Sequence, residues 1–535
     1  MNPVTLTIDG VGVNALPGQS VLAAARSLGI DIPTLCYLEK CGPLNSCLVC
    51  LVKINGKLVP ACGTKVQPGM IVESETEEVH QARRTALELL FSDHIGDCLA
   101  PCHRLCPLGL NIPAMIRQVH SGDFREANTI VRNALPLAGI LGRLCHHPCE
   151  QGCRRGTWDD PAAIRDLERF VTDSALKAAG AARSAPSIPA CQAATGNSVV
   201  IVGAGPTGLG AAYYLARNGH AVTVVDRHSR VGGTLREVNP EELPAEVMEN
   251  EEALLRKMGI QFKFGVGLGD HLTIEGLSRG FDAILLAFGQ TPASAVAALG
   301  LPVEGAKLKA DPNTCQISLK VFAAGAAVKP IKQLVRALAE GRAAAECVHR
   351  FLTNQPVRRP EKPFSSVMGR LSPAELRQFL SAGNTAGAVL PCDRCAGFTN
   401  AEAGMAASRC LHCDCRSSGN CLLQHYAQNY GVDAHHFKAE RRNFEQQLQL
   451  GGVIFEPGKC ILCGICVKLT ELAREPLGLT FIGRGFDVRI GAPLNHTIEQ
   501  GLQNVADECV CNCPTGALSW RAPESKAPKS KATLA

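Results

Sequence analysis

Residues 199–210 read Val-Val-Ile-Val-Gly-Ala-Gly-Pro-Thr-Gly-Leu-Gly and decide the fold of the middle of the chain. The apolar run predicts a buried strand, and Gly203, Gly205 and Gly208 predict a tight turn that leads into a helix. Such a turn offers backbone amides and the positive end of a helix to a pyrophosphate. Asp226 closes the next apolar run about 20 residues on, as expected for an acid that binds a ribose hydroxyl. The sequence therefore predicts a dinucleotide-binding turn.

The apolar runs around this turn fit one α/β domain. Segments separated by helical stretches predict buried parallel strands, and they lie at 199–202, 221–225, 283–287 and 321–323. We therefore predict a Rossmann-like domain over residues 196–352.

Composition limits the class of protein. A chain of 535 residues is long enough for about three to five domains. Its 54 Lys and Arg against 49 Asp and Glu form no sustained basic face, so nucleic acid is not an expected partner. No segment approaches the ~20 apolar residues of a membrane span, and the first ten residues do not resemble a signal peptide. We therefore expect a cytoplasmic protein with no direct membrane span.

The 26 cysteines gather towards the two ends of the chain. Only Cys191, Cys315 and Cys347 lie between Cys153 and Cys392. Because a reducing compartment keeps thiols unpaired, metal ligation is the better interpretation of so many cysteines. The metal chemistry is therefore expected on either side of the dinucleotide domain.

Residues 1–82 are predicted to combine short strands with one helix, and Asp9-Gly10 and Asn55-Gly56 are predicted to form turns between strands. The same residues contain four suitably spaced thiols. Cys36, Cys47, Cys50 and Cys62 fit a wide form of the plant-type 2Fe-2S pattern. The stretches that carry these cysteines resemble the first domain of the largest iron-sulfur subunit of respiratory complex I. They include Ile-Pro-Thr-Leu-Cys-Tyr and Asn-Ser-Cys-Leu-Val-Cys-Leu-Val. That resemblance implies one 2Fe-2S cluster, with buried unliganded cysteines as the alternative. Cys41 is not assigned.

Residues 83–177 are predicted to be helical and contain six cysteines in two groups. Three stretches resemble the amino-terminal domain of the glutamate synthase small subunit and of dihydropyrimidine dehydrogenase. They are Gly-Asp-Cys-Leu-Ala-Pro-Cys, Cys-Pro-Leu-Gly and Gly-Arg-Leu-Cys-His-His-Pro-Cys-Glu. The resemblance implies two 4Fe-4S clusters, each with ligands from both groups. The expected sets are Cys98, Cys102 and Cys153 for one cluster and Cys106, Cys145 and Cys149 for the other, although the interleaving stays open.

Six cysteines leave two coordination positions for other ligands. Glu168 falls where the resembling dehydrogenase has a side-chain oxygen ligand. His94 precedes Cys98 as a histidine ligand precedes its cysteine in the complex I subunit. Each residue has an ordinary surface or capping role as its alternative.

Two further motifs resemble the FAD domain of the glutamate synthase small subunit. They are Val-Gly-Gly-Thr-Leu-Arg from residue 231 and Ala-Ile-Leu-Leu-Ala-Phe-Gly from residue 283. This resemblance favours FAD over NAD. The candidate cofactor-binding residues are Gly203, Ala204, Gly205, Gly208, Asp226, Arg227, Gly232, Gly233, Thr234, Leu235, Gly289 and Gly325.

The nicotinamide-binding unit of that family has no evident counterpart. The interval 290–320 contains only Gly300 and Gly305, whereas a complete βαβ unit needs ~30 residues and its own glycine motif. Ala326 also replaces the aspartate that holds the flavin's ribityl chain in the family pattern. The alternative to a flavin site is therefore a scaffold that binds flavin weakly or not at all.

The carboxy-terminal half contains two more cysteine groups. The first group is a ferredoxin-like set for a 4Fe-4S cluster, in a domain over 450–521. It consists of Cys460, Cys463, Cys466 and the Cys513-Pro pair. Zinc is the alternative metal, and Cys509 and Cys511 are nearby alternative ligands. The segment 385–430 has six cysteines. Its simplest set for another 4Fe-4S cluster is Cys410, Cys413, Cys415 and Cys421, with a zinc or purely structural role as the alternative; Cys392 and Cys395 are unassigned.

Together these motifs predict a multi-domain α/β and α+β oxidoreductase. It combines a plant-type ferredoxin fold, a helical double-cluster domain, a Rossmann-like FAD domain and a ferredoxin-like carboxy-terminal cluster domain. The expected cofactors are one 2Fe-2S cluster, three or four 4Fe-4S clusters and FAD. A flavin exchanges one or two electrons and clusters exchange one, so the combination suits an electron conduit.

We therefore expect an electron-transfer subunit of a larger cytoplasmic, hetero-oligomeric complex with other redox subunits. It would relay electrons between a partner of nicotinamide diaphorase, hydrogenase or formate dehydrogenase type and another redox centre. No catalytic acid-base set is visible. The alternatives are a free-standing NAD(P)H-dependent oxidoreductase of glutamate synthase small-subunit type and a scaffold with an empty nucleotide fold.

Overall fold

The computed structural model describes residues 3–520, apart from 182–187, 270, 292–299, 306, 381–383, 418, 438–440 and 449–451. The chain forms two compact units, each assembled from separate segments. Unit 1 consists of Met1–Ala100, Pro363–Ser381 and Cys413–Ala535, and unit 2 consists of Pro101–Lys362 and Ala382–His412. Cysteine groups that are continuous in sequence are therefore divided between the units. The predicted mixed α/β multi-domain architecture is confirmed.

Unit 1 begins with a five-stranded sheet in the order β2-β1-β7-β5-β6. Its strands are β1 (Val4–Ile8), β2 (Val11–Ala15), β5 (Leu51–Ile54), β6 (Lys57–Pro60) and β7 (Ile71–Glu73). The helix α1 (Val21–Ser27) buries its apolar face against this sheet. Both residues of the Asp9-Gly10 and Asn55-Gly56 pairs have positive φ, which matches the twist of a two-residue hairpin. The predicted turns at these pairs are confirmed.

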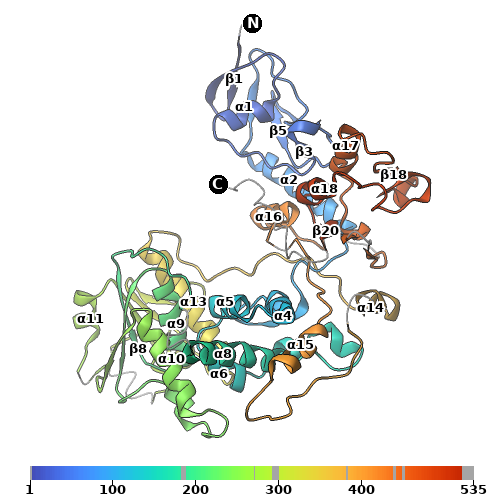
Figure 1. The fold of residues 1–535 in the computed structure, drawn as a ribbon. Helices are drawn as coiled ribbons and strands as arrows, with labels where there is room; N and C mark the ends of the chain where they lie inside the picture. The colour runs from blue at the N-terminus through green and yellow to red at the C-terminus, as the bar shows by residue number, and fades with distance from the viewer. Residues whose placement is uncertain are drawn as a thin grey trace. The chain divides into compact units, whose positions relative to one another are not determined.

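The rest of unit 1 gathers around the long helix α2 (Glu77–Ser92), which Thr76 caps. Figure 1 shows α16 (Leu422–Asn429) beside α2, although the two helices are far apart in sequence. A three-stranded sheet follows, in the order β16 (Gln447–Leu448), β17 (Val453–Phe455) and β20 (Leu518–Trp520). With α17 (Ile465–Leu472) and α18 (Ala506–Asn512), these elements share one apolar core.

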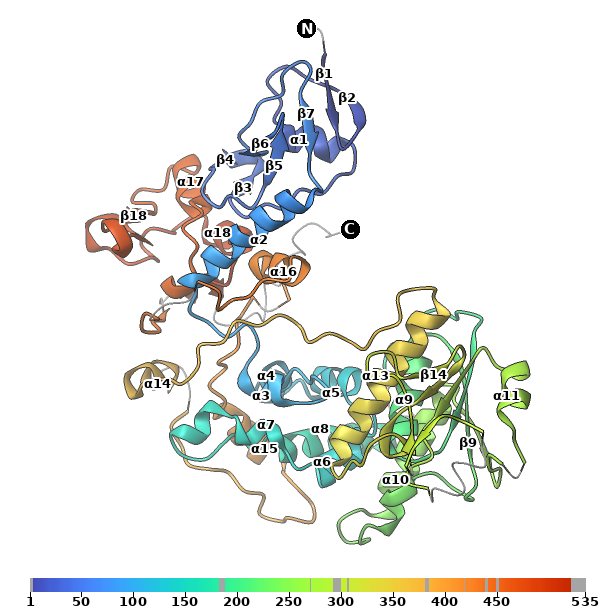
Figure 2. The ribbon, with the colours of Figure 1, turned by 180° about the vertical axis from the view of Figure 1, so that it is seen from behind.

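Unit 2 contains a six-stranded sheet in the order β10-β9-β8-β11-β15-β14. The central strands are parallel, and β14 pairs with β15 in the antiparallel sense. The strands are β8 (Ser198–Val202), β9 (Ala221–Asp226), β10 (Gln261–Phe264), β11 (Ala283–Leu286), β14 (Gln316–Ser318) and β15 (Val321–Ala323). The helices α9 (Pro206–Arg217) and α13 (Leu334–Leu352) pack against each other, while α11 (Ile274–Gly280) lies on the opposite face of the sheet (Figure 2).

A helical part of unit 2 lies beside this sheet domain. It is built from α3 (Pro101–Leu105), α4 (Ile112–Ser121), α5 (Phe124–Ala134), α6 (Ala138–Leu144), α7 (Pro148–Gln151), α8 (Ile164–Ala181) and α15 (Asn400–Ser408). The buried Arg132 of α5 pairs with the buried Glu251 of α10 (Ala245–Lys257), with Nη1 and Oε2 2.7 Å apart. This ion pair joins the helical part to the sheet domain.

Between β11 and β14, the described residues form little structure. They contain only β12 (Val303–Glu304) and β13 (Lys307–Leu308), which pair as a short hairpin. Residues 292–299 and 306, within the interval discussed for the nicotinamide unit, lie outside the described residues. In the described part of the chain, no helix is both long and apolar enough to cross a membrane.

Candidate cofactor sites

The four amino-terminal cysteines of the predicted 2Fe-2S set converge on one buried point. The Sγ atoms of Cys50 and Cys62 are 3.3 Å apart, and the Asn45 Oδ1 lies 3.2 Å from the Cys62 Sγ. Hydrogen bonds from the Cys47 and Cys62 thiols lower the pKa of Cys36 to about 2. The thiolate is the metal-binding form of cysteine. The arrangement fits a small cluster wrapped by one loop and by the turn after β6 that carries Cys62.

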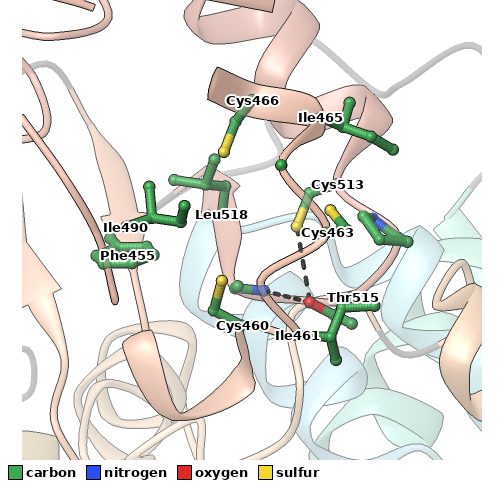
Figure 3. Close-up of a pocket in the computed structure, with 13 residues that line it drawn as sticks. Phe455, Cys460, Ile461, Cys463, Ile465, Cys466, Ile490, Cys513, Thr515 and Leu518 are labelled. Atoms are coloured by element: carbon green, nitrogen blue, oxygen red, sulfur yellow. Dashed lines mark hydrogen bonds between the residues drawn. The ribbon is translucent and has the colours of Figure 1, made fainter. Parts of the chain in front are cut away.

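The carboxy-terminal cysteines line a pocket that suits a larger cluster. Apolar side chains, among them Phe455, Ile490 and Leu518, complete its wall. Figure 3 shows sulfur atoms on several sides of this pocket, and they belong to Cys460, Cys463, Cys466 and Cys513. Burial raises the pKa of Cys460 to about 12. Thiols held so far from water ionise only against a positive charge such as iron.

Local backbone geometry shapes this pocket. Leu462 and Gly464 both have positive φ (53° and 80°), which turns the loop between the first three cysteines back on itself. The Leu462 amide donates to the Cys460 Sγ over 3.4 Å. Such amide-sulfur hydrogen bonds stabilise thiolate ligands and tune clusters.

A second pocket, in unit 2, joins three cysteines and a carboxylate. It is lined by Cys106, Cys145, Cys149 and Glu168, with Leu135, Leu141 and Val335. Burial raises the pKa of Glu168 to about 8, and no described residue donates a hydrogen bond to this carboxylate. A buried carboxylate beside three thiols fits a 4Fe-4S cluster with one oxygen ligand. The structure thus brings one of the two predicted cysteine sets together with Glu168, one of the two predicted non-cysteine ligands.

The expected set of Cys98, Cys102 and Cys153 includes residues of both units. Cys98 belongs to unit 1, whereas Cys102 and Cys153 belong to unit 2. Within unit 1, the Cys415 amide donates to the Cys98 carbonyl oxygen over 3.3 Å. The Ser366 amide donates to the Cys98 Sγ over 3.4 Å. Cys98 therefore lies beside a cysteine from the far end of the sequence.

The predicted set of Cys410, Cys413, Cys415 and Cys421 also includes residues of both units. Cys410 belongs to unit 2 and the other three cysteines to unit 1. The Cys421 Sγ lies 3.7 Å from the Pro514 carbonyl oxygen, next to the carboxy-terminal pocket. His94 is buried in unit 1, four residues before Cys98.

Two buried arginines connect the Cys153 and Cys410 loops inside unit 2. The Arg155 Nη1 donates to the Arg409 carbonyl oxygen over 3.3 Å, and both guanidinium groups pair with Asp159. Arg155 is two residues after Cys153, and Arg409 directly precedes Cys410. No motif in the sequence marks these arginines, and their only signal is their closeness to cysteines.

The predicted dinucleotide turn has the expected close packing. A Cβ on Gly208 would lie 1.9 Å from the Gly203 carbonyl oxygen, so only glycine permits the helix to begin there. A Cβ on Gly233, which has a φ of +53°, would lie 2.9 Å from the Gly205 Cα. The glycine pair at 232–233 therefore packs directly on the turn. Gly325 approaches the same turn from the end of β15, against Thr207.

Asp226 helps to shape this turn. Its carboxylate accepts hydrogen bonds from the Ala204 amide at 2.7 Å and from the His228 amide at 2.8 Å. A ribose hydroxyl would share these acceptors. Of the other candidate residues, Leu235 is buried, Gly289 is half-buried, and Arg227 and Thr234 are exposed.

Comparisons with known proteins agree with this composition. Residues 1–77 match the 2Fe-2S iron-sulfur cluster binding domain, residues 73–179 match dihydropyrimidine dehydrogenase domain II with its 4Fe-4S cluster, and residues 164–341 match the pyridine nucleotide-disulphide oxidoreductase domain. The chain thus contains two iron-sulfur domains followed by an oxidoreductase domain of the flavin type. The predicted 2Fe-2S, 4Fe-4S and flavin-type domains are confirmed at the level of these families.

Two curated relatives illustrate the homology. Over 218 residues the chain is 37% identical to the NADP(+)-dependent formate dehydrogenase subunit beta of Moorella thermoacetica, covering 38% of this chain and 31% of the relative. Over 215 residues it is 36% identical to the glutamate synthase [NADPH] small chain of Mycobacterium tuberculosis, covering 40% and 42%. The predicted resemblance to the glutamate synthase small subunit is confirmed. The chain matches less than half of the length of each relative.

A solved structure is also similar in part. The NAD+-reducing [NiFe]-hydrogenase in the H2-reduced state is 40% identical over 17% of this chain and 39% of that chain, with a TM-score of 0.17.

Proposed function

We propose that this chain is an iron-sulfur flavoprotein subunit that relays electrons within a larger cytoplasmic oxidoreductase complex. Support comes from the curated relatives named as subunits or chains of formate dehydrogenase and glutamate synthase. The proposed partners are other redox subunits, of nicotinamide diaphorase, hydrogenase or formate dehydrogenase type. Bound clusters would supply one-electron transfer and bound FAD would connect it to two-electron chemistry.

The observation that carries this proposal is the contact of one cluster loop with two others in unit 1. The carboxy-terminal loop is the middle of the three. On one side its Cys463 carbonyl oxygen accepts a hydrogen bond from the Ser46 hydroxyl over 3.3 Å, within the 2Fe-2S loop. On the other side its Pro514 carbonyl oxygen accepts one from the Leu422 amide over 3.0 Å, directly after Cys421. Cofactors bound at these three positions would be neighbours.

We propose four ligand sets for unit 1 and the pocket of unit 2. The amino-terminal set is Cys36, Cys47, Cys50 and Cys62, for a 2Fe-2S cluster. The middle set, for a 4Fe-4S cluster, is Cys460, Cys463, Cys466 and Cys513. The third set, also for a 4Fe-4S cluster, is His94, Cys98, Cys415 and Cys421. The pocket set in unit 2 is Cys106, Cys145, Cys149 and Glu168.

The third set differs from the sets expected from the sequence. Its support is the backbone hydrogen bond between Cys415 and Cys98 and the common membership of all four residues in unit 1. In unit 2, Cys102, Cys153 and Cys410 remain as three thiolates for a further cluster. The arginine link between the Cys153 and Cys410 loops supports this last group.

We propose FAD at the Gly203–Gly208 turn. The close packing of Gly233 and Gly325 on this turn supports the site. The chain's own contribution is to present backbone amides and the start of α9 to the pyrophosphate. Domain boundaries of 1–82, 83–177, 196–352, 385–430 and 450–521 remain predictions.

The test is the cofactor content of chain purified without oxygen. We expect roughly 14 to 18 iron atoms per chain, matching sulfide, and one FAD. Fewer than about 8 irons in intact protein would contradict the relay. Cys513→Ser should reduce the iron content and remove one cluster signal in electron paramagnetic resonance (EPR). The matched control is Cys191→Ser, because Cys191 is exposed and belongs to no proposed set.

A further inference from the structure

A buried ion pair lies at the start of the middle cluster loop. Lys459 directly precedes Cys460 and is 3% exposed. Its Nζ pairs with the Glu456 Oε2 over 2.5 Å, and Glu456 is equally buried. Two buried charges cost several kcal/mol of desolvation each, which their mutual attraction repays only in part. Such a pair is therefore a candidate for a functional role.

The Lys459 side chain lies against the segment between His94 and Cys98. A Cβ placed on Gly96 would lie 2.8 Å from the Lys459 Cε and 3.5 Å from the His94 Nε2. Gly96 is two residues from each of these proposed ligands. The lysine thus leaves its own loop and reaches the third ligand set.

The third ligand set lies around this contact. The Cys415 amide donates to the Cys98 carbonyl oxygen over 3.3 Å, so these two proposed ligands lie together. Lys459 contacts the segment between His94 and Cys98, and burial shields its charge from water. A charge shielded in this way interacts with its surroundings more strongly than an exposed charge does. The charge of Lys459 therefore acts on the third ligand set.

We propose that Lys459 sets the reduction potential of the cluster held by His94, Cys98, Cys415 and Cys421. Reduction adds one negative charge at that site, and a fixed positive charge nearby stabilises the reduced state. Glu456 has the opposite sign and limits the effect. A higher reduction potential makes this cluster a better acceptor of one electron from a neighbouring cluster, which is oxidised as the third cluster is reduced. This inference rests on the third ligand set proposed above.

The experiment is an EPR-monitored redox titration of the full chain with its clusters bound. The third cluster's signal is identified first, as the one lost in both Cys415→Ser and Cys421→Ser. Lys459→Gln should then shift the reduction equilibrium of that signal roughly tenfold towards the oxidised form, or about 59 mV lower for a one-electron couple. Glu456→Gln should shift it in the opposite direction. Lys459→Arg, which keeps the charge, should restore the native potential.

Two comparisons keep the result interpretable. Lys459→Gln leaves Glu456 buried without its partner, so the double variant Lys459→Gln/Glu456→Gln is measured against Glu456→Gln alone. The difference between their reduction potentials isolates the effect of the lysine charge. The potential of the third cluster should be lower in the double variant than in Glu456→Gln. The matched control is Lys53→Gln, which removes an exposed ion pair with Glu78 in the same unit and should leave the potential unchanged.

The possible failures are distinct. If Cys415→Ser and Cys421→Ser retain every cluster signal, the third ligand set of the proposed function is wrong. If the two cysteine variants remove one signal, the role of Lys459 can be judged from the potential of that signal. The role is overturned if Lys459→Gln and Glu456→Gln shift this potential in the same direction. It is also overturned if they shift the potential no more than Lys53→Gln does. A merely structural pair would not give shifts of opposite sign.

Discussion

At the scale of single residues, Gly205 offers a direct test of the proposed flavin site. A Cβ added there would have no neighbour closer than the Gly233 Cα at 4.0 Å, so a side chain fits without disturbing the turn. Gly205→Glu should therefore fold but push a carboxylate into the position of the pyrophosphate. We expect this variant to contain no FAD, as measured by release of flavin on denaturation.

Ala326→Asp is the companion variant. It restores the aspartate of the family pattern, so it should hold FAD at least as firmly as the native chain. The lost hydrogen bond costs about 1.5 to 3 kcal/mol, or roughly ten- to a hundredfold in affinity, which a tight flavin site tolerates. Native protein that releases no flavin, or Gly205→Glu with a full complement, would identify the domain as a scaffold.

Residue patterns predicted some sites better than others for a physical reason. The structure brings Cys460, Cys463 and Cys466 together in one pocket, because a single loop carries them. The sequence did not place Cys98 beside Cys415, since all of unit 2 lies between them in the chain. Cysteine spacing predicts ligands that share one loop. A site built from Cys98 and Cys415 depends instead on which distant segments of the chain pack together.

At the scale of elements, a buried ion pair holds α5 against α10. The Glu251 carboxylate also accepts a hydrogen bond from the Gly139 amide over 2.7 Å. Arg132→Met would leave this carboxylate buried without its cation, and we expect a loss of about 3 to 5 kcal/mol. Hydrogen exchange of α5 and α10 measures this loss as an increase in local opening.

Two controls accompany this prediction. The double variant Arg132→Met/Glu251→Met removes both charges and should recover much of the lost protection. Arg256→Ala, which breaks an exposed pair with Glu252 on the same helix, should cost only about 0.3 to 0.5 kcal/mol. Equal effects of Arg132→Met and Arg256→Ala would show that burial of the pair does not matter.

The docking of α14 (Pro373–Leu380) in unit 1 should depend on pH. Hydrogen bonds from Arg441 and from the Phe444 amide lower the pKa of Glu375 to about 2, from an ordinary value near 4.5. The folded state therefore binds this proton less readily than the unfolded state. The stabilisation, about 3 kcal/mol, is complete above pH 4.5 and is lost as the pH falls towards 2.

Hydrogen exchange of α14, corrected for intrinsic rates, measures this dependence. Native protein should lose protection between pH 5 and pH 3. Glu375→Gln should show weaker protection at pH 6 and little further loss on acidification, because the titrating group is gone. The stacked rings of Phe379 and Phe444, 4.4 Å between centroids, remain in both proteins. A native α14 with equal protection at both pH values would contradict the prediction.

At the scale of the whole molecule, the sequence predicted the modules but not how segments combine into units. The turns at Asp9-Gly10 and Asn55-Gly56 and the parallel strands around residues 199–202 are local, and they are present as predicted. The division into two units is not local, because each unit is assembled from separated segments. Packing of apolar surfaces between distant segments decides that division, and no periodicity records it.

The final prediction concerns what the whole chain does alone with nicotinamides. Among the described residues, only the two-residue strands β12 and β13 lie between β11 and β14. Such a hairpin is too small to form a second glycine-rich βαβ unit, which needs ~30 residues. We therefore expect the isolated chain neither to bind NADH or NADPH tightly nor to oxidise them. A partner subunit would then supply the two-electron donor or acceptor.

Anaerobic stopped-flow mixing tests this expectation. NADH or NADPH should leave the flavin absorbance of the isolated chain unchanged over the time in which dithionite, as the control, bleaches it. Dithionite reduction shows that the flavin is present and redox-active, so a lack of response to nicotinamides cannot be attributed to an empty site. Rapid bleaching by either nicotinamide would instead favour a free-standing oxidoreductase, because hydride transfer requires the nicotinamide ring to be held against the flavin of the same chain.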